Sequence, residues 1–137
     1  MFVLGFPLLL VPFAIYNMIA FLTPGVAWTA PLTTVHLMSG EDWVPTFEDA
    51  LLAFSLFLLL IEIIKSTRTG TRSIMDHILA TALFIAMMVE FLLVQRAGTS
   101  TFFLLTMISL VDVFMGFIVS IRSARRRVEI GTEPPAL

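Results

Sequence analysis

The sequence contains no cysteine and only two histidines among its 137 residues. Without cysteine the chain has no disulfide, no thiolate nucleophile and no thiolate ligand for a metal or an iron–sulfur cluster. His36 and His77 are separated by one of the long apolar stretches described below, so a site that uses both imidazoles is not expected. We therefore predict neither a metal centre nor a cofactor.

Charged residues are also scarce. They make up 13% of the chain, whereas hydrophobic residues make up 58% and the mean hydropathy is +1.00. Soluble domains contain about 45–50% apolar and about 25% charged residues. A short chain of this composition cannot hide its apolar surface from water, which predicts a lipid bilayer as its surroundings. The net charge of −2 gives no reason to expect a nucleic-acid partner.

Recognisable catalytic motifs are absent as well. The sequence has no nucleophile motif, phosphate-binding loop, zinc motif or dinucleotide fingerprint. We therefore predict that the protein is not an enzyme.

Four long apolar stretches organise the chain. Each holds about 18–22 residues, or roughly 27–33 Å of helix, which matches the hydrocarbon thickness of a bilayer. Backbone groups in lipid must be satisfied within the segment, so each stretch is expected to be helical. The first stretch has no preceding Lys or Arg, which favours a retained helix over a cleaved signal peptide. The fold class is therefore predicted as all-α, a four-helix transmembrane bundle, with helices at about 2–22, 47–65, 74–95 and 101–122.

Local signals predict where these helices begin, end and bend. Thr46 with Asp49, and Ser73 with Asp76, have the spacing of capping boxes that open the second and third helices. Pro12 lies inside the first predicted helix and is expected to kink it. The connections after the second and third helices are short, so consecutive helices are expected to be antiparallel neighbours.

The positions of lysine and arginine predict the orientation. Seven of the eight lie after the second helix or after the fourth, and only Arg96 lies on the opposite side. The positive-inside rule therefore places the second connection and both termini in the cytoplasm. The loop between the first two helices, about 24 residues at 23–46, then faces outward, and its residues 35–44 are expected to form a hairpin lying on the membrane. Residues 1–127 are predicted to form one membrane domain, and residues 128–137 a disordered cytoplasmic tail.

Three carboxylates, Asp112, Glu90 and Glu62, fall inside the predicted spans. Ionisable groups are costly in hydrocarbon, so they are candidates for a functional intramembrane site. They are either a ladder that relays protons or binds a cation, or structural groups. In the structural interpretation Glu62 and Glu90 reach the interfaces and Asp112 bonds within the bundle or to a partner.

Small residues recur on one face of two helices. The candidate helix-packing face comprises Ser109, Gly116 and Ser120 on the fourth helix, and Ala82 and Ala86 on the third. Spacings of three, four and seven place such residues on one side of a helix, where they allow neighbouring helices to approach closely. We expect these stripes to point inward.

A basic group follows the fourth helix. Arg122, Arg125, Arg126 and Arg127 are candidates for binding anionic lipid headgroups, and they also set the topology.

These features favour a non-enzymatic, multi-pass protein of a bacterial inner (cytoplasmic) membrane. It would act through helix packing, with itself as a homo-oligomer or as an accessory, structural subunit of a membrane complex. The main alternative is a proton- or cation-coupled small transporter or channel that uses the intramembrane carboxylates. A third interpretation is a sensor or binding module built on the outer loop around His36 and Trp43.

Overall fold

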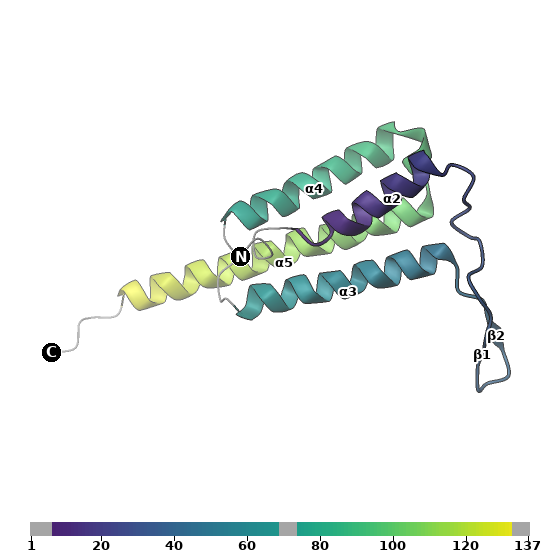
Figure 1. Cartoon of the computed structure of the whole chain (residues 1–137). Coiled ribbons are helices and arrows are strands. Elements are labelled where there is room, and N and C mark those ends of the chain that lie inside the picture. Colours follow the sequence, from purple (N-terminus) through teal and green to yellow (C-terminus); the bar gives the residue numbers. More distant parts are fainter. Residues whose placement is uncertain (1–6, 69–73, 133–137) are drawn as a thin grey trace.

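The structure is a computed structural model that describes residues 7–68 and 74–132 (Figure 1). The described residues form four α-helices and are otherwise mostly loop, which confirms the expected all-α fold class. The helices are α2 (Leu10–Leu22), α3 (Phe47–Arg68), α4 (Ile74–Leu93) and α5 (Ser100–Thr132). A 3₁₀ turn, η1 (Gln95–Ala97), precedes α5, and two short strands, β1 (Val35–His36) and β2 (Asp42–Trp43), form a hairpin.

The helices lie side by side, with α5 as the longest element and α3 and α4 packed against it (Figure 1). The shorter α2 lies over the part of the bundle nearest the hairpin. The turn between α4 and α5 is at this same end, which we call the hairpin end. The last part of α5 extends beyond the other helices at the opposite end.

Two of the helices are long and apolar enough to cross a membrane. The qualifying segments are Met75–Leu93 in α4 and Ser100–Ile118 in α5, each of 19 residues. The 13 residues of α2 rise only about 20 Å, less than the roughly 30 Å of a hydrocarbon core. α3 has 22 residues but carries charged side chains near both of its ends.

The first helix begins later than the apolar pattern predicts. Residues 1–6 lie outside the described part, and α2 starts at Leu10 after a turn in which the Leu10 N–H donates to the Pro7 carbonyl (3.0 Å). Pro12 is therefore in the first helical turn, where an N–H would have no partner within the helix, so the lack of one costs no hydrogen bond. The kink was expected because Pro12 was placed in the helix interior. At the start of the helix a proline gives no reason for a kink.

The start of α3 confirms the predicted capping box. The Asp49 N–H donates to Thr46 Oγ1 (3.3 Å), and the Thr46 N–H donates to Asp49 Oδ2 (3.0 Å). Two donors without partners in the helix are thus satisfied reciprocally. The matching box at the third helix cannot be compared, since Ser73 lies outside the described residues.

The last helix is longer than predicted. α5 runs to Thr132, so residues 123–132 continue the helix beyond the expected end at 122, and residues 128–132 of the expected tail are helical. The arginines in this segment favour helix once chain extension has begun. Residues 133–137 lie outside the described part.

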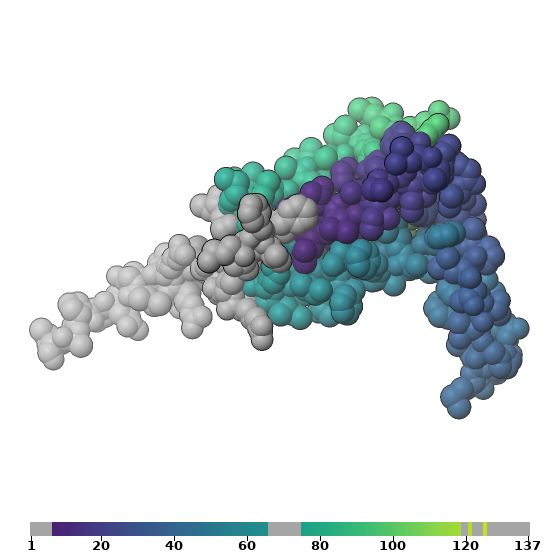
Figure 2. Space-filling view, in the orientation of Figure 1, coloured from purple at the N-terminus to yellow at the C-terminus, as the bar shows by residue number. Residues whose placement is uncertain are grey.

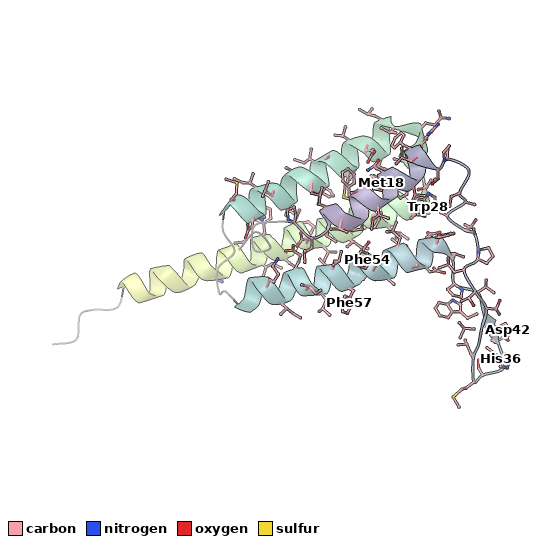
Figure 3. All side chains as sticks on the ribbon, in the orientation of Figure 1. Met18, Trp28, His36, Asp42, Phe54 and Phe57 are labelled. Carbon is pink, nitrogen blue, oxygen red and sulfur yellow. The ribbon has the colours of Figure 1, made fainter. Side chains whose placement is uncertain are left out.

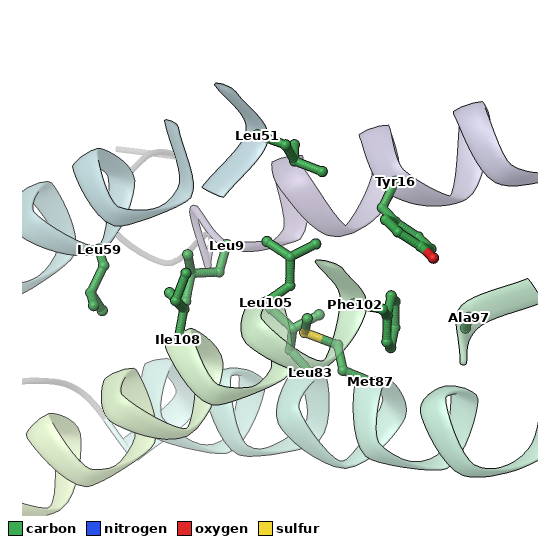
Figure 4. Close-up of a cluster of buried hydrophobic side chains, with 10 residues drawn as sticks. All are labelled: Leu9, Tyr16, Leu51, Leu59, Leu83, Met87, Ala97, Phe102, Leu105 and Ile108. Carbon is green, nitrogen blue, oxygen red and sulfur yellow. The ribbon is translucent and has the colours of Figure 1, made fainter. Parts of the chain in front are cut away.

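The core is a layer of apolar side chains between α5 and its neighbours (Figure 4). It contains Leu83 and Met87 from α4, Leu51 and Leu59 from α3, Leu9 and Tyr16 near α2, Ala97 from η1, and Phe102, Leu105 and Ile108 from α5. The outward faces of the helices are also apolar, with exposed side chains such as Phe54, Phe57 and Leu60 on α3. Exposed apolar surfaces of this size mark contacts with a membrane or with another protein.

Candidate functional site

Several polar side chains link α2 to other elements, and a second set of buried polar side chains lies on α3 and α5. At the start of α2, Glu62 of α3 is 5% exposed and accepts a hydrogen bond from the Leu8 backbone N–H (2.7 Å). This N–H belongs to the turn that leads into α2, ahead of the N-cap residue Leu9. A carboxylate at this position also interacts favourably with the positive end of the helix dipole. Glu62 thus joins the segment before α2 to α3. Its expected reach to the interface stays a prediction.

At the hairpin end, Tyr16 joins α2 to the connection between α4 and α5. Its hydroxyl donates to the Arg96 carbonyl (3.1 Å) and shares a hydrogen bond with Thr99 Oγ1 (2.7 Å). Its ring stacks on Trp28 at 4.6 Å between centroids and lies 4.9 Å from the Phe102 ring. The side chain is fully buried. One tyrosine thus supplies both aromatic packing and the polar link that holds α2 in place.

Glu90 of α4 takes part in the same region. Its Oε2 accepts a hydrogen bond from Asn17 Nδ2 (3.2 Å), and the same amide nitrogen donates to the Phe13 carbonyl (3.0 Å). Asn17 therefore bonds a neighbouring helix. Glu90 was expected to reach towards the interface and Arg96, but its described hydrogen bond goes to α2.

Arg96 completes the links at the end of α2. Its Nη1 donates to the Ala20 carbonyl (3.3 Å), and its guanidinium lies 5.6 Å from the centroid of the Phe21 ring. The Ala20 carbonyl is among the last four of the helix, which lack internal donors. A cation also suits the negative end of the helix dipole. α2 is thus held by a carboxylate at its start and a guanidinium at its end, both from other elements.

Asp112 lies inside the bundle, as the sequence suggested. It is 2% exposed on α5, and two hydroxyl residues, Ser55 of α3 and Ser109 of α5, are buried to the same degree. The Ser55 hydroxyl donates to the Leu51 carbonyl of its own helix (2.7 Å). Neither Asp112 nor Glu62 is without an interaction partner. The interior of α3 and α5 therefore contains a polar strip within the apolar core.

The small-residue face divides into two parts. Ser109 and Gly116 are buried within the chain, where they allow α5 to lie close to its neighbours. Ala82 and Ala86, expected to point inward, are exposed on the outward side of α4. Their direction follows from Leu83 and Met87, which occupy the inward side of the same helix. The side chain of Ser120 lies outside the described part.

The basic group after the fourth predicted span is only partly described. Arg125 is exposed on α5, which leaves its guanidinium accessible to a headgroup or to water. The side chains of Arg122, Arg126 and Arg127 are outside the described part, so lipid binding by this group stays a prediction.

The described residues contain no group of three or more acidic or histidine side chains that could hold a metal ion. His36 Nδ1 lies 2.6 Å from Asp42 Oδ1 across the exposed hairpin, and His77 packs edge-on against Phe117 at 4.5 Å between centroids. The His36–Asp42 contact joins the two strands of the hairpin.

The sequence analysis did not identify Arg96, Thr99 and Trp28 as residues that contact α2. One available signal was that Tyr16 is the sole tyrosine of the chain and lies in an apolar stretch. A buried tyrosine hydroxyl needs a hydrogen-bond partner, which in lipid must come from another segment.

Comparison with known proteins gives no relative: no family model, curated protein or solved structure matches this chain.

Proposed function

We propose that this chain is a non-enzymatic integral membrane protein that acts through lateral helix packing, with a second copy of itself or as an accessory subunit of a membrane complex. The observation that carries the proposal is the use of the intramembrane carboxylates. Glu62 and Glu90 both accept hydrogen bonds that join α2 to other helices. Acids engaged in this way support the bundle and need no transported ion to explain their presence in lipid.

The proposal includes four membrane-embedded helices with both termini in the cytoplasm of a bacterial cell. Support comes from the apolar exteriors of the helices and from the seven lysines and arginines on one side. α2 has only 13 residues, and the proposed first crossing is the apolar stretch at about 2–22 of the sequence. The hairpin end is then outside.

The outward face of α4 supplies the partner contact. Ala82 and Ala86 are exposed one turn apart at the centre of this face. Small side chains at this spacing let a second helix approach closely, which is the main source of helix association in lipid. A partner helix, from another copy or another subunit, packs against this pair.

Replacing Ala82 and Ala86 by leucine tests this contact. The added bulk separates the helices, so the complex extracted in mild detergent becomes smaller or loses its partner. Particle mass by light scattering and the composition of the purified sample measure the outcome.

A matched control is Ala53→Leu, which makes the same change at an exposed alanine on α3. The control variant keeps the wild-type assembly. A wild-type particle mass and composition in the α4 double variant would contradict the proposed contact.

A second candidate function is proton or cation transport, favoured by the burial of Asp112 beside an interior that also holds Ser55 and Ser109. An acid of this kind can bind a proton or a cation inside the bundle. Asp112→Asn then abolishes ion flux in liposomes at unchanged protein level. Absence of flux by the wild-type protein under proton and cation gradients would eliminate this candidate.

A further inference from the structure

We propose that the outer hairpin is an interfacial anchor whose apolar face inserts into the outer leaflet beside the bundle. Residues 35–43 form this hairpin, which extends sideways beyond α3 at the end of the helices and stands apart from them (Figures 1 and 2). If the helices cross the bilayer, as the proposed function requires, a segment that runs crosswise at their ends lies along the membrane surface.

The hairpin is a regular structure with a defined pair of faces. Val35 pairs with Trp43 and His36 pairs with Asp42 in antiparallel register. The Gly40 N–H donates to the Leu37 carbonyl (3.0 Å), and Gly40 has φ of 96°, a conformation that favours glycine. This is the pattern of a three-residue hairpin loop with a glycine bulge, which fixes the register. Alternate residues therefore point to opposite faces.

One face is polar and the other is mainly apolar. His36 and Asp42 are joined across the strands at 2.6 Å. Alternation places Val35, Leu37 and Trp43 on the opposite face, and all three are exposed. Glu41, beside the loop, is the one acidic residue at the edge of that face, where its carboxylate reaches the headgroups.

The direction of these faces identifies the occupant. Figure 3 shows His36 and Asp42 on the side of the hairpin that points away from the helices. The face with Trp43 is consequently turned back towards the level of the helices, into the space beside the outward side of α3. In the proposed orientation that space contains lipid, and tryptophan is enriched at this depth. The polar face then meets water.

This inference rests on the proposed membrane embedding. Tryptophan fluorescence tests the hairpin anchor and the embedding of the helices separately. The chain has two tryptophans, and Trp28→Phe leaves Trp43 as the sole reporter while it keeps an aromatic ring beside Tyr16. The full-length protein is reconstituted in zwitterionic phosphatidylcholine vesicles. We expect quenching of Trp43 by lipid brominated near the headgroup end of its chains, and severalfold weaker quenching by aqueous iodide than that of free tryptophan amide.

Two variants sharpen the measurement. Leu37→Asp places a charge on the apolar face, so the Trp43 emission shifts to the red and its quenching by iodide rises severalfold. His36→Gln alters the polar face and leaves both signals as in the parent protein. Lipid embedding is measured separately with Phe57→Trp in a chain whose native tryptophans are phenylalanine, where deep brominated lipid quenches the new indole.

Strong quenching of Trp43 by iodide with none by brominated lipid overturns the anchor. Protection from both quenchers also overturns it, because the hairpin is then covered by protein. If Phe57→Trp is not quenched by deep brominated lipid, the proposed membrane embedding itself fails, and the anchor fails with it.

Discussion

Individual polar residues in this chain act where helix ends would otherwise leave backbone groups unsatisfied. Glu62 accepts from the Leu8 N–H before α2, and Arg96 donates to the Ala20 carbonyl at its end. In the proposed membrane location no water replaces these bonds, so each partner lost leaves a buried polar group without compensation. The placement of single charges therefore decides whether α2 is held in the bundle.

Removal of the Glu62 carboxylate is expected to destabilise the fold. Glu62→Ala leaves the Leu8 N–H unsatisfied and lowers the free energy of unfolding by about 1–3 kcal/mol. Glu62→Gln keeps an acceptor oxygen and has a smaller effect. Denaturant unfolding in micelles measures both, with the exposed Glu41→Ala as a control expected within about 0.5 kcal/mol of wild type. Equal stability of Glu62→Ala and wild type would show that the cap contributes nothing.

The Tyr16 hydroxyl allows a similar measurement without loss of the aromatic ring. Tyr16→Phe keeps the contacts with Trp28 and Phe102. It loses the hydrogen bonds to Thr99 Oγ1 and to the Arg96 carbonyl. We expect a loss of about 1 kcal/mol, near the upper range for hydrogen bonds between membrane helices. A double-mutant cycle with Thr99→Val isolates the pair, because the two losses are not additive when the groups interact. Strict additivity would contradict a direct bond.

At the scale of elements, the helices differ in what stabilises them. α4 and α5 pack along their lengths through core residues such as Met87 and Leu105, whereas α2 is short and depends on polar links at both ends. α3 starts with a capping box of its own residues, and two loop carbonyls, those of Ala30 and Trp28, accept from its first N–H groups. Loss of the capping box should therefore affect only the first turn of α3. Loss of the links from Glu62 or Arg96 should instead release the whole of α2.

The capping box gives an element-scale prediction. Thr46→Ala removes the acceptor for the Asp49 N–H and is expected to cost about 1 kcal/mol. Amide hydrogen exchange should accelerate in the first turn of α3 and stay unchanged in α4. Thr29→Ala, an exposed threonine of the same loop, is the matched control. Uniform acceleration over all helices would instead indicate a global loss of stability.

At the scale of the whole molecule, the absence of native cysteine permits a clean test of orientation. Residues 119–132 add roughly 20 Å of helix beyond the candidate span of α5, so Arg125 should lie in the cytoplasm. In intact cells a membrane-impermeant maleimide should label Ser39→Cys, at the hairpin loop, and should label Arg125→Cys only after the membrane is opened. The reverse pattern would contradict the proposed topology.

Local pattern was sufficient for most of the architecture. The apolar stretches predicted the four helices, and the Thr46–Asp49 spacing predicted the start of α3. The hairpin expected at residues 35–44 is present, with its turn at Gly40. Each of these depends on residues a few positions apart, whose spacing is visible in the sequence. The start of α2 and the end of α5 differed because helix ends depend on contacts that periodicity does not contain.

By itself, then, the sequence determined an all-α chain with four apolar helices, one loop hairpin and three carboxylates inside the apolar segments. Only the tertiary structure decided which groups those carboxylates meet. The partners of Glu62, Glu90 and Arg96 in α2 or just before it lie 54, 73 and 76 positions away along the chain. Such pairings follow from how the helices pack and rotate against one another, and no short-range spacing encodes them.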